Sequence, residues 1–135
     1  MRRVVILSLA ALPAAALAAA PPSALAKVAG GLWEISGVPG ANAPVRQCVA
    51  DVLTLAQFEH RSRTCTHTVI SDDGSSTVIR YSCGGAGFGH SEIDVITPRS
   101  LRIATQGISD ELPFNYVLQA HRVGDCEKSA SSSSH

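Results

Sequence analysis

Thr64–Cys83 reads TCTHTVISDDGSSTVIRYSC, and this stretch decides the fold. Two runs rich in β-branched residues flank an Asp-Gly turn, which is a strong short-range signal for a β-hairpin. With Asp73–Ser75 as the loop, the expected pairs are Asp72 with Ser76, Val69 with Ile79, His67 with Tyr81, and Cys65 with Cys83. Opposed Cβ atoms in such a ribbon lie roughly 4.5–5.5 Å apart, so the hairpin is expected to close through its own disulfide.

The chain has four cysteines, and an even number in a small exported domain indicates disulfides. The hairpin register favours Cys65–Cys83, which leaves Cys48 to pair with Cys126. Sequential pairing, Cys48–Cys65 with Cys83–Cys126, is the open alternative. A zinc site is a weaker interpretation, because structural zinc sites usually take two ligands from a short Cys-x2-Cys knuckle, and these cysteines are far apart in sequence.

The first 26 residues have the pattern of a secretory signal peptide. Arg2 and Arg3 form a basic start, Val4–Leu12 is apolar, and Ala24–Ala26 offers small residues before a cleavage site. Cleavage is expected after Ala26. A membrane anchor is the competing interpretation, but prolines interrupt the apolar run and it is short for a ~20-residue span. We therefore expect periplasmic localisation and no membrane span after cleavage.

The remainder reads as one domain over 27–126, followed by a serine-rich tail over 127–135 that is expected to be disordered. Without Arg2 and Arg3, acidic residues outnumber lysine and arginine by two. A nucleic-acid partner is not expected, because such binding needs a clustered positive field that releases counterions.

Short alternating runs separated by turn residues predict an all-β fold. Besides the hairpin, strands are expected over Gly31–Gly37, Pro44–Val49, His90–Thr97, Leu101–Gly107 and Phe114–Val123, with a helix over Asp51–Glu59 and a loop over Gly107–Pro113. Val95 is expected to face Ile103. The predicted architecture is an antiparallel up-and-down meander of about seven short strands, curled into a half-barrel or partly closed barrel with one short helix. A two-sheet sandwich is the alternative.

No motif in the chain assembles a catalytic group, a cofactor site or a metal site. The glycine-rich run Gly84–Gly89 lacks the spacing of a phosphate-binding loop and leads into a strand, so it is expected to bend the sheet. The acidic pairs Asp72-Asp73 and Asp110-Glu111 lie on predicted turns, where acidic residues are common for backbone reasons. The protein is therefore not expected to be an enzyme.

Curled antiparallel sheets often hold a small ligand in their mouth. The candidate pocket residues are Trp33, His67, Tyr81, Phe114 and Tyr116. The favoured interpretation of His67 is a packing residue opposite Tyr81. The alternative is that His67 joins His90 or His121 as a weak metal or ligand contact.

Several motifs together resemble the domain-of-unknown-function 3617 family, which comprises small exported proteins of proteobacteria. They are Gly31-Leu-Trp-Glu34, Gln47-Cys48 before a short helix, the Cys65 and Cys83 hairpin, and the closing Arg122-Val-Gly-Asp-Cys126. The resemblance covers Gly31–Cys126. It implies a periplasmic location and supplies no activity, substrate or catalytic residue.

The leading functional hypothesis is a non-enzymatic periplasmic module that binds a small apolar ligand or a periplasmic protein partner. A structural or stress-related envelope factor, recognised through an apolar patch or open sheet edge, is the alternative. A hydrolase is less favoured, and it predicts that His67, His90 and His121 share one cleft with carboxylates.

Overall fold

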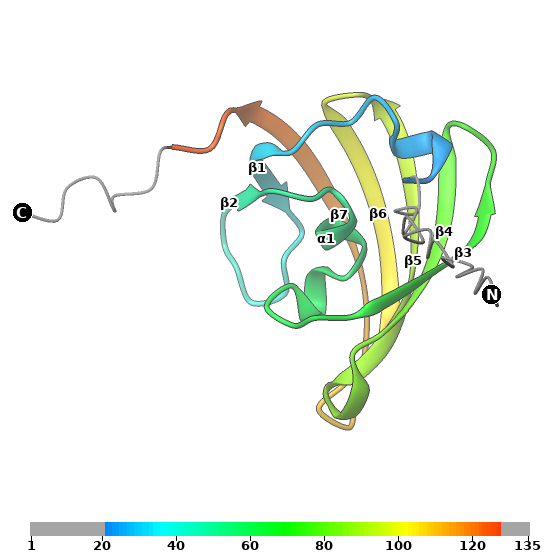
Figure 1. Cartoon of the computed structure of the whole chain (residues 1–135). Helices are drawn as coiled ribbons and strands as arrows, with labels where there is room; N and C mark the ends of the chain where they lie inside the picture. The colour runs from blue at the N-terminus through cyan, green and yellow to red at the C-terminus, as the bar shows by residue number, and fades with distance from the viewer. Residues whose placement is uncertain (1–20, 128–135) are drawn as a thin grey trace, which may run out of the picture.

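Seven strands form one antiparallel sheet in the computed structural model, which describes residues 21–127 (Figure 1). The strands are β1 Gly31–Ser36, β2 Val45–Val49, β3 Thr66–Asp72, β4 Ser76–Ser82, β5 Gly87–Thr97, β6 Ser100–Ser109 and β7 Leu112–Gly124. Their order across the sheet is β2-β1-β7-β6-β5-β4-β3. Most of the predicted signal peptide and all but one residue of the predicted tail lie outside the described residues.

The sheet is a meander from β3 to β7, to which the first hairpin is added beside β7. It curls around the short helix α1, and its two edge strands, β2 and β3, do not pair with each other (Figure 1). The predicted half-barrel is therefore confirmed for the described residues, and they do not form a two-sheet sandwich. No helix within residues 21–127 has the length and apolar character needed to cross a membrane.

Both predicted disulfides are confirmed, with Cα–Cα distances of 4.3 Å for Cys65–Cys83 and 5.4 Å for Cys48–Cys126. The hairpin pairs Val69 with Ile79 and His67 with Tyr81 are also confirmed. Next to the turn the predicted register is wrong, because Asp72 pairs with Thr77 rather than with Ser76. A bulge between Val69 and Ser71 takes up the extra residue.

The β5–β6 register differs from the prediction by two residues. Val95 pairs with Leu101, not with Ile103, because Thr97 pairs with Ser100 and the turn holds only Pro98 and Arg99. A shift of two residues leaves every side chain on its predicted face, since strand side chains alternate with period two.

The predicted loop over Gly107–Pro113 is wrong. β6 continues to Ser109 and β7 begins at Leu112, so only Asp110 and Glu111 form the turn. Both have positive φ values, 48° and 69°. This is the backbone of a two-residue hairpin turn whose twist matches that of the flanking strands.

The predicted helix over Asp51–Glu59 is shorter and divided. It comprises α1, Leu53–Ala56, and a 3-10 turn η2, Phe58–His60. The Asp51 carboxylate accepts a hydrogen bond of 2.9 Å from the Leu53 amide at the start, and Gln57 leaves the helical conformation with φ −107° and ψ 37°. Leu55, Ala56 and Phe58 are buried against the concave face of the sheet.

The concave face supplies the core of the sheet. Its fully buried side chains include Trp33, Ile35, Ile79, Tyr81, Ile93, Leu101, Ile103 and Leu118. The other side chains of the same strands point to the convex face, which we call the outer face. No described element covers the outer face of β4 to β7 (Figure 1).

Candidate ligand site on the outer face

A buried histidine links η2 to the sheet on the concave side. The His60 Nε2 atom lies 3.0 Å from the Ala86 carbonyl oxygen, so Nε2 donates its hydrogen to that oxygen. Nδ1, 3.1 Å from the Tyr81 hydroxyl, then accepts from it. Burial raises the pKa of Tyr81 to about 12, with the charge of Glu59 adding to the effect. Tyr81 is therefore a neutral donor at ordinary pH.

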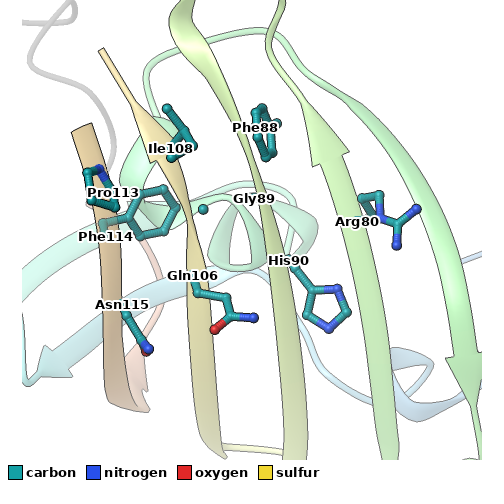
Figure 2. A pocket seen from close by; sticks show the side chains of 10 residues that line it. Arg80, Phe88, Gly89, His90, Gln106, Ile108, Pro113, Phe114 and Asn115 are labelled. Carbon is teal, nitrogen blue, oxygen red and sulfur yellow. The ribbon is translucent and has the colours of Figure 1, made fainter. Parts of the chain in front are cut away.

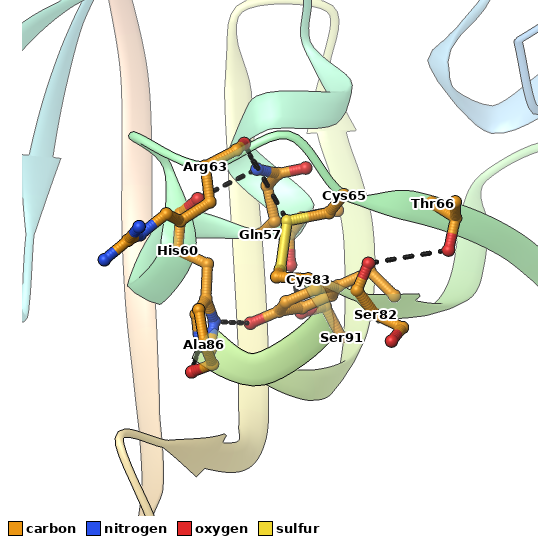
Figure 3. The surroundings of a disulfide bond; sticks show 11 residues. Gln57, His60, Arg63, Cys65, Thr66, Ser82, Cys83, Ala86 and Ser91 are labelled. Atoms are coloured by element: carbon orange, nitrogen blue, oxygen red, sulfur yellow. Dashed lines mark hydrogen bonds between the residues drawn. A yellow bond between two sulfur atoms is a disulfide. The ribbon is translucent and has the colours of Figure 1, made fainter.

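The Tyr81 ring reaches His60 because Gly89, opposite it on β5, has no side chain. A Cβ at Gly89 would lie 2.4 Å from the ring. Figure 3 shows the Cys65–Cys83 disulfide beside this chain of hydrogen bonds, with the Gln57 amide donating to the His60 and Arg63 carbonyls at 2.9 and 2.8 Å.

Two further contacts fasten α1 and η2 to the sheet. The Tyr116 hydroxyl donates to the Glu59 carboxylate at 2.7 Å, and desolvation together with this bond raises the pKa of Tyr116. The Ser91 hydroxyl contacts the Ala56 carbonyl oxygen and, at 2.8 Å, the Thr105 hydroxyl. These interior polar groups bond to one another, whereas the buried Trp33 indole nitrogen has no hydrogen-bond partner among the described residues. The concave side is closed by its own covering segment.

The five pocket residues predicted from the sequence do not come together as one pocket. Trp33 and Tyr81 are buried in the core. Phe114 and Tyr116 are half-buried, with ring centroids 5.8 Å apart. His67 lines a separate cavity of about 330 Å³ between β3 and α1, where desolvation lowers its pKa and the charge of Asp51 opposes that shift.

The histidines of the hydrolase hypothesis are also separated. His67 opposes Tyr81 on the inner face of β3, whereas His90 and His121 belong to the outer face. His121 Nδ1 lies 2.8 Å from the Ser100 hydroxyl. Within residues 21–127, no three or more His, Cys, Asp or Glu residues are grouped so that they hold a metal ion.

A cavity on the outer face has a volume of about 640 Å³ (Figure 2). Its polar side is a straight row of one residue from each of β4, β5, β6 and β7, which pair across the sheet: Arg80, His90, Gln106 and Asn115. Its apolar side is the next row on the same face, Phe88, Ile108 and Pro113, joined by Phe114. Phe88 is 53% exposed.

Between these rows the backbone of two glycines forms the floor of the cavity, and both glycines occupy inner-face positions in register with Tyr81. Gly89 pairs with Gly107 across β5 and β6. A Cβ at Gly107 would lie 2.1 Å from the Phe88 carbonyl oxygen and 3.0 Å from the Phe114 ring. The glycine pair therefore leaves room on the inner face for the Tyr81 and Phe114 rings, whose centroids lie 5.5 and 5.9 Å from that of His60. Its backbone borders the cavity on the outer face.

The lining combines an apolar surface with hydrogen-bond donors. Among the described residues that line the cavity, Arg80 alone carries a formal charge. The Gln106 and Asn115 amides and the His90 ring add further donors. Glu92 borders the neighbouring shallow cavity, and Asp94 is engaged by Arg102 at 3.5 Å. A molecule with an apolar body and a negatively charged, planar head matches this arrangement.

Four residues of the lining are not among the site residues predicted from the sequence: Arg80, Phe88, Gln106 and Asn115. The signal that brings them together is cross-strand pairing, which requires the correct register over four strands. Comparisons of this chain with protein-family models, with curated proteins and with solved structures return no match. The resemblance to the domain-of-unknown-function 3617 family accordingly stays a prediction.

Proposed function

We propose that this protein is an exported, non-enzymatic module that binds a small amphipathic molecule in the outer-face cavity. The ligand would have an apolar body and a carboxylate or similar anionic head. The observation that carries the proposal is the row of donors beside a row of apolar side chains, above the Gly89–Gly107 pair. The cavity volume of about 640 Å³ is within the range common for small-molecule sites.

Charge and geometry support the proposed orientation of the ligand. The head would lie toward Arg80, because a guanidinium makes two parallel hydrogen bonds to a carboxylate. The apolar body of the ligand would cover Phe88 and Ile108, which are otherwise in contact with solvent. Burial of such apolar surface provides the driving force, at about 25 cal/mol per Å².

Two disulfides support a compartment that is more oxidising than the cytosol. The basic and apolar start of the chain supports export to the periplasm by a signal peptide. A molecule of this kind would therefore be met outside the cytosolic membrane.

A titration with two eight-carbon probes tests the proposal. Octanoate and octan-1-ol are added separately to the oxidised protein, and amide chemical shifts are followed by NMR. Octanoate is expected to bind at least about tenfold more tightly than the alcohol and to shift Gln106 and Asn115, because a hydrogen bond to a charged group contributes about 1.5–3 kcal/mol.

Three variants separate the roles of the lining. Arg80→Gln is expected to weaken octanoate to the level of the alcohol, and Phe88→Ala to weaken both probes. Arg46→Gln, at an exposed arginine on β2 outside the cavity, serves as the matched control and should change neither affinity. Equal octanoate binding by wild type and Arg80→Gln, or shifts confined to the His67 cavity, contradicts the proposal.

The open edge of β3 favours a second candidate, a protein-binding function. All seven residues of β3 are exposed, and Val69 and Ile70 are 47% and 48% exposed. β4 is the only neighbour of β3 among the described strands, so its outer backbone groups are open to an extended segment of a protein partner that adds as an eighth strand. Ile70→Pro would block such an addition without touching the outer-face cavity.

A further inference from the structure

A segment assigned to the signal peptide by its sequence is packed into the folded domain. The chain enters through a 3-10 turn η1, Ser23–Leu25, that contacts β4 and β5. Ala24, Leu25 and Val28 are only 4%, 3% and 9% exposed, and Leu25 and Val28 belong to the same apolar cluster as the core of the sheet. These side chains therefore extend the core of the sheet beside β4 and β5.

Polar contacts hold the same segment to the tip of the β3–β4 hairpin. The Asp72 carboxylate accepts hydrogen bonds from the Ser23 amide, from the Ser23 hydroxyl at 2.8 Å and from the Ala24 amide at 3.0 Å. Desolvation acts to raise the pKa of Asp72, but these bonds outweigh it and bring the pKa below its usual value. Ser23 and Ala24 therefore supply three of the four hydrogen bonds to the carboxylate at the end of β3, and the Gly74 amide supplies the fourth at 3.4 Å.

Cleavage after Ala26 would remove these partners. The domain would begin at Lys27, Leu25 would be missing from the core, and Asp72 would lose all three hydrogen bonds from Ser23 and Ala24. Pro21 and Pro22, which form part of the wall of the His67 cavity, would be removed as well. Cleavage after Ala26 would therefore remove residues that pack into the folded domain.

The sequence contains another site with the required small residues. Ala16-Leu17-Ala18 has alanine at both positions that a signal peptidase recognises. Its last residue, Ala18, lies five positions after Pro13, which follows the apolar run. Cleavage there leaves Ala19 as the first residue. Cleavage after Ala20 would instead leave Pro21 at the new terminus, which the peptidase tolerates poorly.

We propose that an export-linked signal peptidase hydrolyses the Ala18–Ala19 peptide bond and that residues 22–28 remain in the mature protein as part of its core. One water is consumed in the step: its hydroxyl joins the Ala18 carbonyl and its hydrogen joins the Ala19 amine. The processing step rests on the proposed export, whereas the packing of residues 22–28 does not.

The mature terminus tests the cleavage site directly. The full chain is expressed in a Gram-negative host, and the periplasmic product is analysed by intact mass and N-terminal sequencing. Ala19 is the expected first residue. Lys27 as the first residue overturns the proposal, and Leu17 or Pro21 overturns the assigned bond while supporting retention of the segment. An uncleaved chain overturns the processing step together with the export on which it rests.

Paired substitutions sharpen the assignment. Ala18→Phe places a large side chain at the residue before the cut and should eliminate the product that begins at Ala19. Ala26→Phe, at an exposed residue after η1, should leave that product unchanged. The reverse pattern identifies Ala26 as the cleavage position and overturns the proposal.

Thermal unfolding tests retention of the segment independently of export. Oxidised chains that begin at Ala19 and at Lys27 are compared, and the shorter chain is expected to melt about 10 °C lower or to fail to fold. Leu25→Ala in the longer chain should also lower the melting temperature by several degrees, with Lys27→Ala, at an exposed residue, as control. Equal melting temperatures for the two chains overturn retention.

Discussion

The two faces of β4 to β7 are made by alternating residues of the same strands, yet they differ in polarity, in exposure and in what covers them. The inner face is largely apolar and covered by α1 and η2, and most of its few polar groups bond to one another, as in the His60–Tyr81 pair. Within residues 21–127 no element covers the outer face, which carries a row of hydrogen-bond donors beside exposed Phe88. Neighbouring residues of one strand therefore belong either to the packed core or to the lining of the outer-face cavity.

This comparison gives the molecule a simple rule. A change to an inner residue should lower the free energy of unfolding and leave the cavity chemistry alone. A change to an outer residue should alter the chemistry of the cavity and leave the free energy of unfolding almost unchanged. The Gly89–Gly107 pair is the exception, because its missing side chains leave room for Tyr81 on the inner face while its backbone borders the cavity on the outer face.

The largest difference is expected between two isoleucines of β5. Ile93 is fully buried on the inner face, and Ile96 is 65% exposed. Ile93→Ala should cost about 4 kcal/mol, because it removes buried apolar atoms and leaves a cavity. Ile96→Ala should stay within about 0.5 kcal/mol of wild type in urea unfolding. Similar losses for the two variants would break the distinction between the faces.

Gly89→Ala is expected to cost about 3 kcal/mol. The new Cβ would lie 2.4 Å from the Tyr81 ring and push it away from His60, so both packing and a buried hydrogen bond are lost. Gly85→Ala is the matched control, since a Cβ there has no atom within 4 Å and its φ is not positive. Chemical denaturation of the two variants measures the difference, and a neutral Gly89→Ala would contradict the packing described for Tyr81.

Alkaline pH should destabilise the inner face. The pKa of Tyr81 is about 12 in the folded protein against 10.0 in an unfolded chain, so the unfolded state loses this proton first. The stability that Tyr81 contributes is present below pH 10 and is lost as the pH rises through about 12, by about 2–3 kcal/mol at one pKa unit per ~1.4 kcal/mol. Unfolding measured from pH 8 to 12 checks this. Tyr81→Phe should show a weaker loss, and an equal loss would exclude Tyr81 as the cause.

The smallest of these effects concerns a single hydroxyl. Ser91→Ala should cost about 1–2 kcal/mol, because the Ala56 carbonyl and the Thr105 hydroxyl each lose a buried partner. Glu92→Ala, one position along on the outer face, should have almost no effect. Amide hydrogen exchange should show the loss for Ser91→Ala most clearly in α1, and unchanged exchange there would argue against a fastening role for Ser91.

Local patterns sufficed for the fold, because each depends on a few neighbouring residues. The Asp-Gly turn and the β-branched runs predicted the hairpin, the Cys65–Cys83 disulfide and the faces of Ile79 and Tyr81. The errors in register came from a bulge after Val69 and from a turn shorter than expected. Glycine and proline usually interrupt strands, but Gly107 and Pro113 are both accommodated within the β6–β7 ladder, so the predicted loop over Gly107–Pro113 is wrong.

The candidate site could not be predicted in the same way. A row across four strands exists only when three registers are correct at once, and the error of two residues in β5–β6 separates His90 from Gln106. The predicted pocket instead used aromatic residues that face inward. Trp33 and Tyr81 do face inward, but the covering segment from α1 to η2 occupies the space that a ligand would need.

The Cys48–Cys126 disulfide imposes an order on oxidative folding. Its two cysteines are 78 positions apart, and Cys126 is the last thiol to emerge from a ribosome or a translocation pore. Until then Cys48 meets only Cys65 and Cys83 as partners, while these two already have each other across the hairpin. If the hairpin disulfide forms first, Cys48 stays reduced until Cys126 is available. If Cys48 instead forms a disulfide with Cys65 or Cys83, thiol–disulfide exchange must break that bond before β1 can join β7.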